Sequence, residues 1–183
     1  RMYVVESVAA RNVIRGVQGD RESTFEEKIK ALQDDLERAK ELGFTEIGIS
    51  VKSGQVINND GSAVFMGDRD YFRKAMKGES VVTGTIISRL SNSAAIAYTA
   101  PIRHYATGEI QGVVNGIVDA ALFSDLVGSI EYGDTGYAFA VDSQGKTVAH
   151  KDVEKVMEEE NITKLVESEP GLAPLAEVVS KMA

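Results

Sequence analysis

The sequence contains no cysteine among its 183 residues. A disulfide framework, a thiolate metal site and a cysteine nucleophile are therefore excluded. Hydrophobic residues make up 43% of the chain and charged residues 26%. That balance is typical of a globular protein with one medium domain or two small ones, whose core needs neither metals nor disulfides.

Positive charge is also in short supply. Twenty lysines and arginines face 28 aspartates and glutamates, which leaves a net charge of −8 and a pI near 4.9. Since no basic stripe exists, nucleic acid is not a predicted partner. No apolar run approaches the roughly 20 residues that cross a bilayer, and no signal peptide is recognisable. We interpret a chain that opens on Arg1 as an excised piece, so these absences say nothing about the parent protein.

Known catalytic and metal-binding patterns are scarce. The two histidines, His104 and His150, fall in separate predicted cycles and make a poor zinc set without cysteine. The three glutamates at 158–160 are typical of a solvated helix face. A glycine-rich phosphate loop, a G-x-S-x-G turn and an H-E-x-x-H helix are all missing. We therefore predict no metal, no cofactor and no enzyme activity.

Residues 2–42 carry apolar side chains at spacings of three and four, which predicts one long helix, at most interrupted. Gly16 and Gly19 mark the place for a bend or break. Residues 23–27 have the pattern of a capped N-terminus at which a second helix could start. Gly43 has the pattern of a residue that ends a helix. An unbroken helix of this length would reach about 60 Å at 1.5 Å per residue.

The pattern then changes to period two, which indicates strands joined by turns. A helix at 68–77, ended by Gly78, interrupts them. This order predicts an α+β fold, an antiparallel sheet with helices packed on it. The predicted strands are residues 44–51, 55–58, 80–89, 94–104 and 110–118.

A second, shorter cycle follows a helical stretch at 120–130. It contains a hairpin with its turn at 142–145 and then helices at 153–165 and 172–182. We therefore predict three parts: an N-terminal helical spine, a first sheet module and a shorter second module. Their expected bounds are residues 1–43, 44–128 and 129–183.

Residues 68–79, DRDYFRKAMKGE, raise the question of a binding site. In one interpretation they form a surface helix with Tyr71 and Phe72 facing the core. In the other, the guanidinium of Arg69 binds a carboxylate at the helix start while the two aromatic rings keep water out. Spacing alone favours the first interpretation, but it leaves Arg69 without a role.

Three segments resemble the double Cache domains, extracellular sensor domains of bacterial and archaeal chemoreceptors, histidine kinases and cyclic-di-nucleotide enzymes. Residues 68–75 are similar to the family's D-R-x-[WYF]-[YF]-x-x-A segment, and residues 108–114 to its G-x-x-x-G-V-V strand. Residues 130–150 match best, resembling the G-x-T-G-Y-x-F-x-x-D-x-x-G-x-x-x-A-H signature of the membrane-proximal module. The resemblance covers nearly the whole chain.

This resemblance implies two PAS-like modules hung on a long N-terminal helix, with the ligand held in the first, membrane-distal module. In amino-acid-binding members, an Arg and an aromatic of the helix motif hold the carboxylate, and Arg69 and Tyr71 match them. A strand Tyr and a last-strand Asp hold the amine, and Ile86 and Ile117 stand at those positions. Isoleucine cannot balance an ammonium charge. A carboxylate or other small organic anion is therefore favoured over an α-amino acid.

Strand alternation adds polar residues to the predicted site, with Tyr98 offering a hydroxyl and Asn115 an amide. Ser88 shares a strand face with Ile86. The predicted ligand-binding residues are Arg69, Tyr71, Phe72, Ile86, Ser88, Tyr98, Asn115 and Ile117.

The leading prediction is a ligand-sensing, extracytoplasmic domain of a membrane-anchored signalling receptor, periplasmic or extracellular, that transmits through the long helix. Its partner is a small-molecule ligand. The second module should be truncated, because the family continues with further strands after the position of His150. One alternative is an enzyme acting on a small carboxylate, and another is a dimerisation module with a vestigial pocket. The sequence leaves open whether the N-terminal helices pair in a homodimer.

Overall fold

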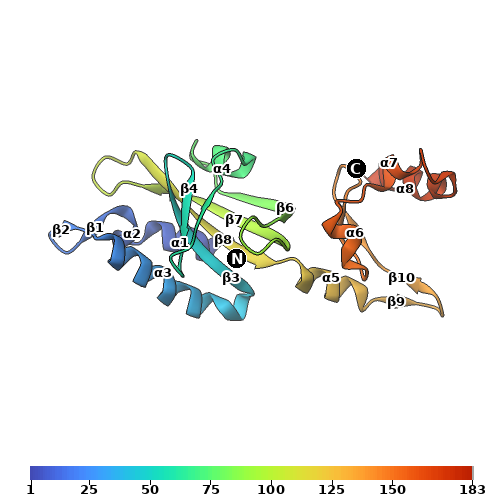
Figure 1. The fold of residues 1–183 in the computed structure, drawn as a ribbon, viewed down its shortest axis with the longest axis horizontal. Coiled ribbons are helices and arrows are strands. Elements are labelled where there is room, and N and C mark those ends of the chain that lie inside the picture. The colour runs from blue at the N-terminus through green and yellow to red at the C-terminus, as the bar shows by residue number, and fades with distance from the viewer. Residues whose placement is uncertain (183) are drawn as a thin grey trace. The chain divides into compact units, whose positions relative to one another are not determined.

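The structure, a computed structural model, describes residues 1–182 and consists of helices packed on antiparallel sheet (Figure 1). The predicted α+β class is confirmed. The helices are α1 (Met2–Ala10), α2 (Asn12–Arg15), α3 (Phe25–Ala39), α4 (Asp70–Ala75), α5 (Ala121–Gly128), α6 (Val153–Met157), α7 (Ile162–Leu165) and α8 (Ala173–Met182), with 3-10 turns η1 (Lys40–Leu42) and η2 (Pro170–Leu172). The strands are β1 (Val17–Gln18), β2 (Arg21–Glu22), β3 (Phe44–Val51), β4 (Gln55–Asn58), β5 (Ala63–Phe65), β6 (Val81–Ile87), β7 (Ala94–Arg103), β8 (Ile110–Asp119), β9 (Glu131–Tyr132), β10 (Gly136–Tyr137), β11 (Ala140–Val141) and β12 (Thr147–Ala149).

The N-terminal region is helical, but the prediction of mostly one helix was wrong. Helix α2 ends at Gly16, whose φ of 104° is left-handed, and the short hairpin β1–β2 follows. This reversal returns the chain, so that Val5 of α1 and Leu32 of α3 belong to one core cluster. The predicted reach of about 60 Å therefore does not exist. Gly19, the second glycine predicted to interrupt the helix, also has a positive φ, of 64°.

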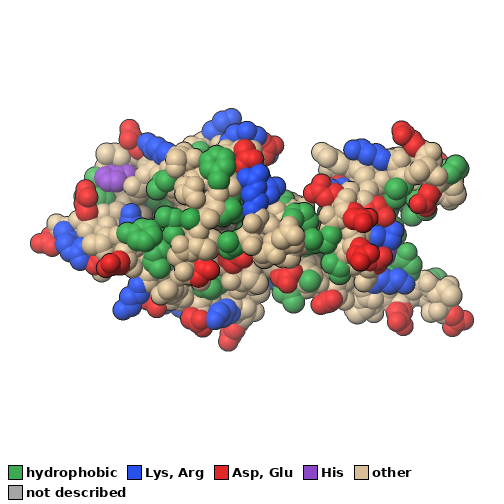
Figure 2. All heavy atoms as spheres, in the orientation of Figure 1, with side chains coloured by type: hydrophobic (Ala, Val, Ile, Leu, Met, Phe, Trp, Pro, Cys, Tyr) green, Lys and Arg blue, Asp and Glu red, His purple; other side chains and the backbone are tan. Residues whose placement is uncertain are grey.

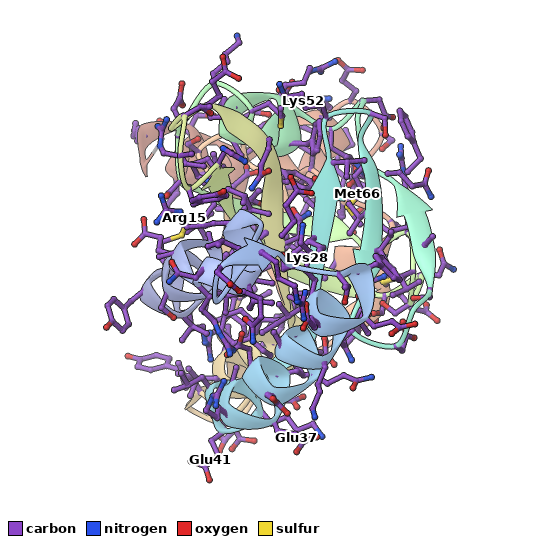
Figure 3. The ribbon with its side chains drawn as sticks, turned by 90° about the vertical axis from the view of Figure 1, so that its left-hand side faces the viewer. Arg15, Lys28, Glu37, Glu41, Lys52 and Met66 are labelled. Atoms are coloured by element: carbon purple, nitrogen blue, oxygen red, sulfur yellow. The ribbon has the colours of Figure 1, made fainter. Side chains whose placement is uncertain are left out.

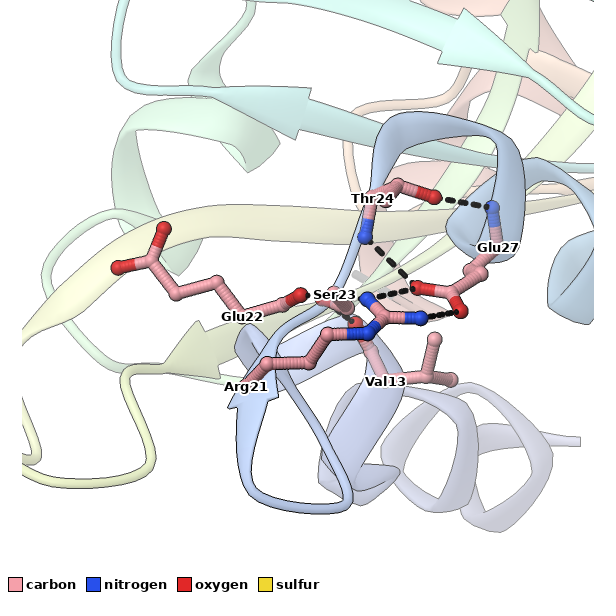
Figure 4. Close-up of polar contacts among 6 residues, drawn as sticks. All are labelled: Val13, Arg21, Glu22, Ser23, Thr24 and Glu27. Carbon is pink, nitrogen blue, oxygen red and sulfur yellow. Dashed lines mark hydrogen bonds and ion pairs between the residues drawn. The ribbon is translucent and has the colours of Figure 1, made fainter.

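Helix α3 starts with the predicted cap (Figure 4). The backbone N–H of Glu27 donates to Thr24 Oγ1 at 3.2 Å, and Glu27 accepts from the backbone N–H of Thr24 at 2.8 Å. This reciprocal arrangement satisfies two backbone donors at the helix start. Arg21 adds a two-pronged contact at 2.5 and 3.1 Å to the same carboxylate. The hydrogen bond from Arg21, followed by that from the Thr24 backbone, lowers the pKa of Glu27 to about 2.

We expect Glu27 to make the protein acid-sensitive. Because its pKa is lowered in the folded state, its stabilising effect is present above its ordinary pKa of 4.5 and is lost as pH falls through about 2. Glu27→Gln should therefore melt at a lower temperature than the parent at neutral pH, and the gap should close towards pH 2. Thermal melts across this range measure it, with Glu26→Gln in the same turn as the control. An unchanged gap at low pH would contradict the assignment.

The main sheet has six strands in the order β5-β4-β3-β8-β7-β6. Central strand β3 pairs antiparallel with β4 and with β8. Four of its strands fall within a few residues of the predicted ranges 44–51, 55–58, 94–104 and 110–118. Strand β6 is shorter than predicted, and the three-residue edge strand β5 had no period-two signal. Figure 1 shows α3 and α4 on opposite sides of these strands.

One face of the sheet packs against α1, α2 and α3. Leu32 and Ile47 are fully buried there, whereas Glu37 and Glu41 point away from the sheet (Figure 3). This segregation is the amphipathic pattern expected of a surface helix. The buried members of this core are Val5, Val8, Ala9, Val13, Ile14, Ala31, Leu32, Leu36, Ala39, Phe44, Ile47, Ala100, Ile102, Val114 and Val118.

The chain forms two compact units. The first comprises Arg1–Thr83 with Ile96–Val118, and the second Gly84–Ala95 with Asp119–Ala183. This division follows contacts in space and differs from the predicted division into residues 1–43, 44–128 and 129–183, which stays a prediction. In the second unit the predicted hairpin turn is confirmed. The Asp142 carboxylate accepts the backbone N–H groups of Gln144 and Lys146 at 2.8 and 3.0 Å.

The helices of the second unit are more broken than predicted. The stretch 153–165 divides into α6 and α7, because Glu159 adopts a φ of 55° and Asn161 caps α7 through the N–H of Thr163. Within residues 1–182, no helix combines the length and apolar character that a membrane crossing needs. Acidic and basic side chains are interspersed on the face shown in Figure 2.

Candidate functional site

Helix α4 carries the aromatic residues of the predicted site. Tyr71 and Phe72 are buried, while Arg73 and Lys74 are exposed, so the predicted inward and outward faces are confirmed. Arg69 is the N-cap residue, with extended backbone and a half-buried side chain. No side-chain cap bond closes this helix start.

The polar end of Tyr71 turns inward. Its hydroxyl donates to the sulfur of Met66 at 3.1 Å, and both side chains are buried. Met66, labelled in Figure 3, lies in the segment between β5 and α4. A thioether is a weak acceptor, so this contact fixes the ring more by packing than by a strong hydrogen bond.

Polar side chains cross the sheet face that lies opposite the α1–α3 core. Gly48 of β3 pairs directly with Asn58 of β4 and with Asn115 of β8, so the three residues share one face and form a row. A Cβ added to Gly48 would lie 2.5 Å from Asn58 Oδ1. The glycine is therefore what lets an asparagine side chain extend over the central strand. Asn58 itself donates from Nδ2 to Ser62 Oγ at 3.1 Å.

Asn115 lies at the centre of this face and is 2% exposed. The hydroxyl of the fully buried Thr99 donates to Asn115 Oδ1 at 3.0 Å. The amide nitrogen of Asn115 has no hydrogen-bond partner, and neither has the hydroxyl of buried Ser50 one row away. Buried polar groups are nearly always hydrogen-bonded, and leaving one unpaired costs about 1–3 kcal/mol. Two such groups on one face make it the candidate binding face of the first unit.

Tyr98 does not belong to this face. Its ring packs edge-on against Phe44 at 5.7 Å, within the core under α1 and α3. Neighbouring side chains of a strand point to opposite faces. Thr99 is consequently the β7 residue that reaches Asn115.

Ser88 also has a different role from the predicted one. It lies beyond the end of β6, and its Oγ accepts the backbone N–H groups of Leu90 and Ser91 at 3.2 and 3.3 Å. This is turn chemistry. Ser88 and Ile86 both belong to the second compact unit, so the site built here includes neither of them.

Ile117 is buried and lies in the first unit, directly opposite Glu46 of β3. Glu46 is half-buried, and burial, with the charge of Asp60 as a second cause, raises its pKa. An acidic group thus stands opposite Ile117, the residue that the sequence resemblance puts at the family's amine-binding aspartate. Asn115, Ile117, Tyr71 and Phe72 all belong to the first compact unit.

Sequence reasoning missed Glu46, Ser50 and Thr99. The signal was present in β3, where Glu46, Gly48 and Ser50 alternate with Ile47 and Ile49. An alternating strand predicts a polar face but not what covers it. In this sheet the polar face is buried too: Ser50, which lies on it, is 3% exposed.

The chain is similar to known sensor proteins in sequence and in fold. A Cache domain family model matches residues 2–179. The ligand-binding domain of Pseudomonas aeruginosa chemoreceptor PctC, solved with GABA, has a TM-score of 0.69 at 21% identity, covering 93% of this chain and 72% of that one. The equivalent domain of Pseudomonas fluorescens CtaA with L-serine has a TM-score of 0.65 at 19% identity, covering 93% and 69%. The P. aeruginosa PctB domain, solved with L-Arg, has a TM-score of 0.66 at 19% identity, covering 90% of this chain and 67% of that one. With a family model spanning nearly all of its length, this chain belongs to the Cache domain family.

Proposed function

We propose that the first compact unit binds a small carboxylate and acts as the ligand-sensing, extracytoplasmic part of a membrane-anchored receptor. The observation that most directly supports this proposal is the buried amide nitrogen of Asn115, which has no hydrogen-bond partner. It lies on a face otherwise built from Asn58, Gly48 and Thr99. Membership of the Cache family supports a sensor over an enzyme. The similar domains of PctC, CtaA and PctB were each solved with an amino acid or GABA bound.

The ligand class follows from the unpaired polar groups of Asn115 and Ser50. The Asn115 amide nitrogen is a donor and the Ser50 hydroxyl can donate, so both match acceptor oxygens. A carboxylate offers several such acceptor positions. Arg69, at the start of the helix that carries Tyr71 and Phe72, supplies the charge-assisted contact in this proposal. The apolar rings and Ile117 match a short hydrocarbon body.

An amino acid is the second candidate, and Glu46 is the specific observation in its favour. Its carboxylate stands opposite Ile117 and would supply the negative charge that isoleucine lacks. Its raised pKa reflects burial and the repulsion of Asp60, both of which a bound ammonium group would offset. The two candidates thus differ in whether Glu46 contributes to binding.

Calorimetric titration with butanoate and GABA tests both candidates, because GABA is butanoate with an added amine. We expect the parent to bind butanoate more tightly than GABA. Asn115→Leu should weaken binding by roughly ten- to a hundredfold, since a hydrogen bond to a charged group contributes about 1.5–3 kcal/mol. Arg69→Ala should do the same, with Arg69→Lys recovering only part. The exposed Asn12→Ala is the matched control.

Glu46→Gln separates the two ligand classes. If the ligand is a carboxylate, this change leaves binding unchanged or stronger, because it removes a nearby negative charge. Tighter binding of GABA by the parent, lost in Glu46→Gln, would replace the carboxylate with an amino acid. Full binding of both compounds by folded Asn115→Leu would refute the site itself.

In this proposal strand β8 transmits the signal, because it lies between the ligand on one face and helix α1 on the other. Asn115 faces the proposed ligand, while the next residue, Gly116, faces α1. A Cβ added to Gly116 would lie 2.9 Å from Val5 Cγ2. If the ligand binds more tightly to one position of β8 than to another, it shifts β8 to the favoured position, and α1 must move with it.

A further inference from the structure

The second compact unit contains a cavity of about 120 Å³. Its walls combine the aromatic rings of Tyr137 and Phe139 with the aliphatic side chains of Ile162 and Leu165. Small-molecule sites are typically apolar chambers with a few directed polar groups. The polar groups of this cavity decide what it can hold.

Thr147 is the first of these groups. It lines the cavity and is 1% exposed, and its hydroxyl has no hydrogen-bond partner. Its backbone N–H is satisfied by the carbonyl of Glu160 at 2.7 Å, so only the side chain is left over. An unpaired hydroxyl at this depth is costly unless a bound molecule completes it.

His150 is the second group. It is 5% exposed and packs edge-on against Tyr137 at 5.2 Å. The backbone N–H of Asp152 donates to its Nδ1 at 2.8 Å, so this nitrogen carries no proton. The neutral ring therefore has its proton on Nε2 and offers a donor there. Thr147 and His150 together match one acceptor oxygen of a ligand.

Three charged residues line the cavity: Lys155 and Glu160 are paired with each other, and Glu169 is exposed to solvent. Lys155 Nζ contacts both carboxylate oxygens of Glu160, at 2.7 and 3.0 Å, and this hydrogen bonding raises the pKa of Lys155. Among the described residues that line the cavity, Lys155 is the sole lysine or arginine. A buried carboxylate would thus enter without a counter-charge, which is unfavourable. Because Lys155 and Glu160 already neutralise each other, an uncharged ligand is favoured over a charged one.

The cavity volume sets the ligand's size. An engineered protein cavity of about 150 Å³ accommodates benzene, and this one is somewhat smaller. Its occupant should therefore have at most about six non-hydrogen atoms.

We propose that this cavity is a second binding site, separate from the face around Asn115, for a small uncharged molecule with one carbonyl or amide oxygen and an apolar body. Its oxygen accepts from Thr147 and His150, and its hydrocarbon part lies against Phe139 and Ile162.

Three compounds of nearly equal shape test the charge requirement: 2-methylpropanamide, 2-methylpropanoate and 2-methylpropylamine. The titrations use the full chain carrying Asn115→Leu, so that binding at the first site does not obscure the result. We expect the amide to bind at least tenfold more tightly than either charged compound. Tighter binding of the acid or the amine would overturn the uncharged class, and no binding by any of the three would overturn the site.

Thr147→Val tests the location. Valine keeps the shape of threonine and deletes the hydroxyl, so amide binding should weaken by about three- to tenfold, the worth of one hydrogen bond. The unliganded variant should melt at the same temperature as the parent or higher, because an unpaired buried group has been removed. Thr135→Val, at an exposed turn position between β9 and β10, is the matched control. Undiminished amide binding by Thr147→Val, or a clearly lower melting temperature, would overturn the assignment.

Discussion

Gly112→Ala is expected to lower the free energy of unfolding by about 3 kcal/mol, the upper part of the range for overpacked sites. Gly112 lies in β8 opposite Val51 of β3. A Cβ added to it would stand 1.9 Å from the backbone oxygen of Ser50. Backbone cannot rotate away as a side chain can, so the central strand pair must separate locally. Urea unfolding monitored by circular dichroism gives the loss directly.

Gly84→Ala is the matched control for this experiment. Gly84 also lies within a strand, and an added Cβ there meets nothing within 4 Å. It should leave stability unchanged or slightly higher, because alanine restricts the unfolded chain more than glycine does. Equal stabilities for the two variants would show that the β3–β8 contact yields without cost.

Phe44→Ala is expected to cost about 3–5 kcal/mol, the range for removing a buried phenylalanine. Phe44 is 2% exposed and packs edge-on against Tyr98. Its ring also fills the space over Gly116, where an added Cβ would lie 2.5 Å from it. The cavity left behind is enclosed by strand backbone and helix α1, which limits how far it can collapse.

Phe25→Ala serves as the comparison, because Phe25 is 54% exposed at the start of α3. Its loss should cost less than about 1 kcal/mol. Chemical denaturation of both variants provides the measurement. A loss below about 1 kcal/mol for Phe44→Ala would mean that this part of the core is not closely packed.

Local signals in the sequence predicted most of the elements. The cap at Thr24, the helix after Arg69 and the hairpin turn at Asp142 formed where turn and capping chemistry placed them. These features depend on neighbours within a few residues, so a single sequence contains the information. The N-terminal helix was overextended because apolar spacing continues past Gly16. Periodicity does not reveal that a left-handed residue reverses the chain.

The site was predicted less well, because it depends on which strand face is buried and by what. Alternation shows that Tyr98 and Thr99 point to opposite faces, but both faces of this sheet are covered. An aromatic residue looked like the better ligand group, and it belongs to the core instead. Glu46 escaped notice for a related reason: its position opposite Ile117 comes from pairing between β3 and β8, which are far apart along the chain.

The reversal at Gly16 also bears on the order in which the protein folds. It lets Arg11, the N-cap residue of α2, meet Asp35 of α3 across only 24 residues of chain in a 2.6 Å ion pair. The contact from Thr45 to Ile117, between β3 and β8, must close 72 residues. Because closing a longer loop costs more entropy and local contacts form faster, the helical segment should assemble first. Closure of the central strands would then limit the rate, with β8 arriving on a β3 that the helices already cover on one side.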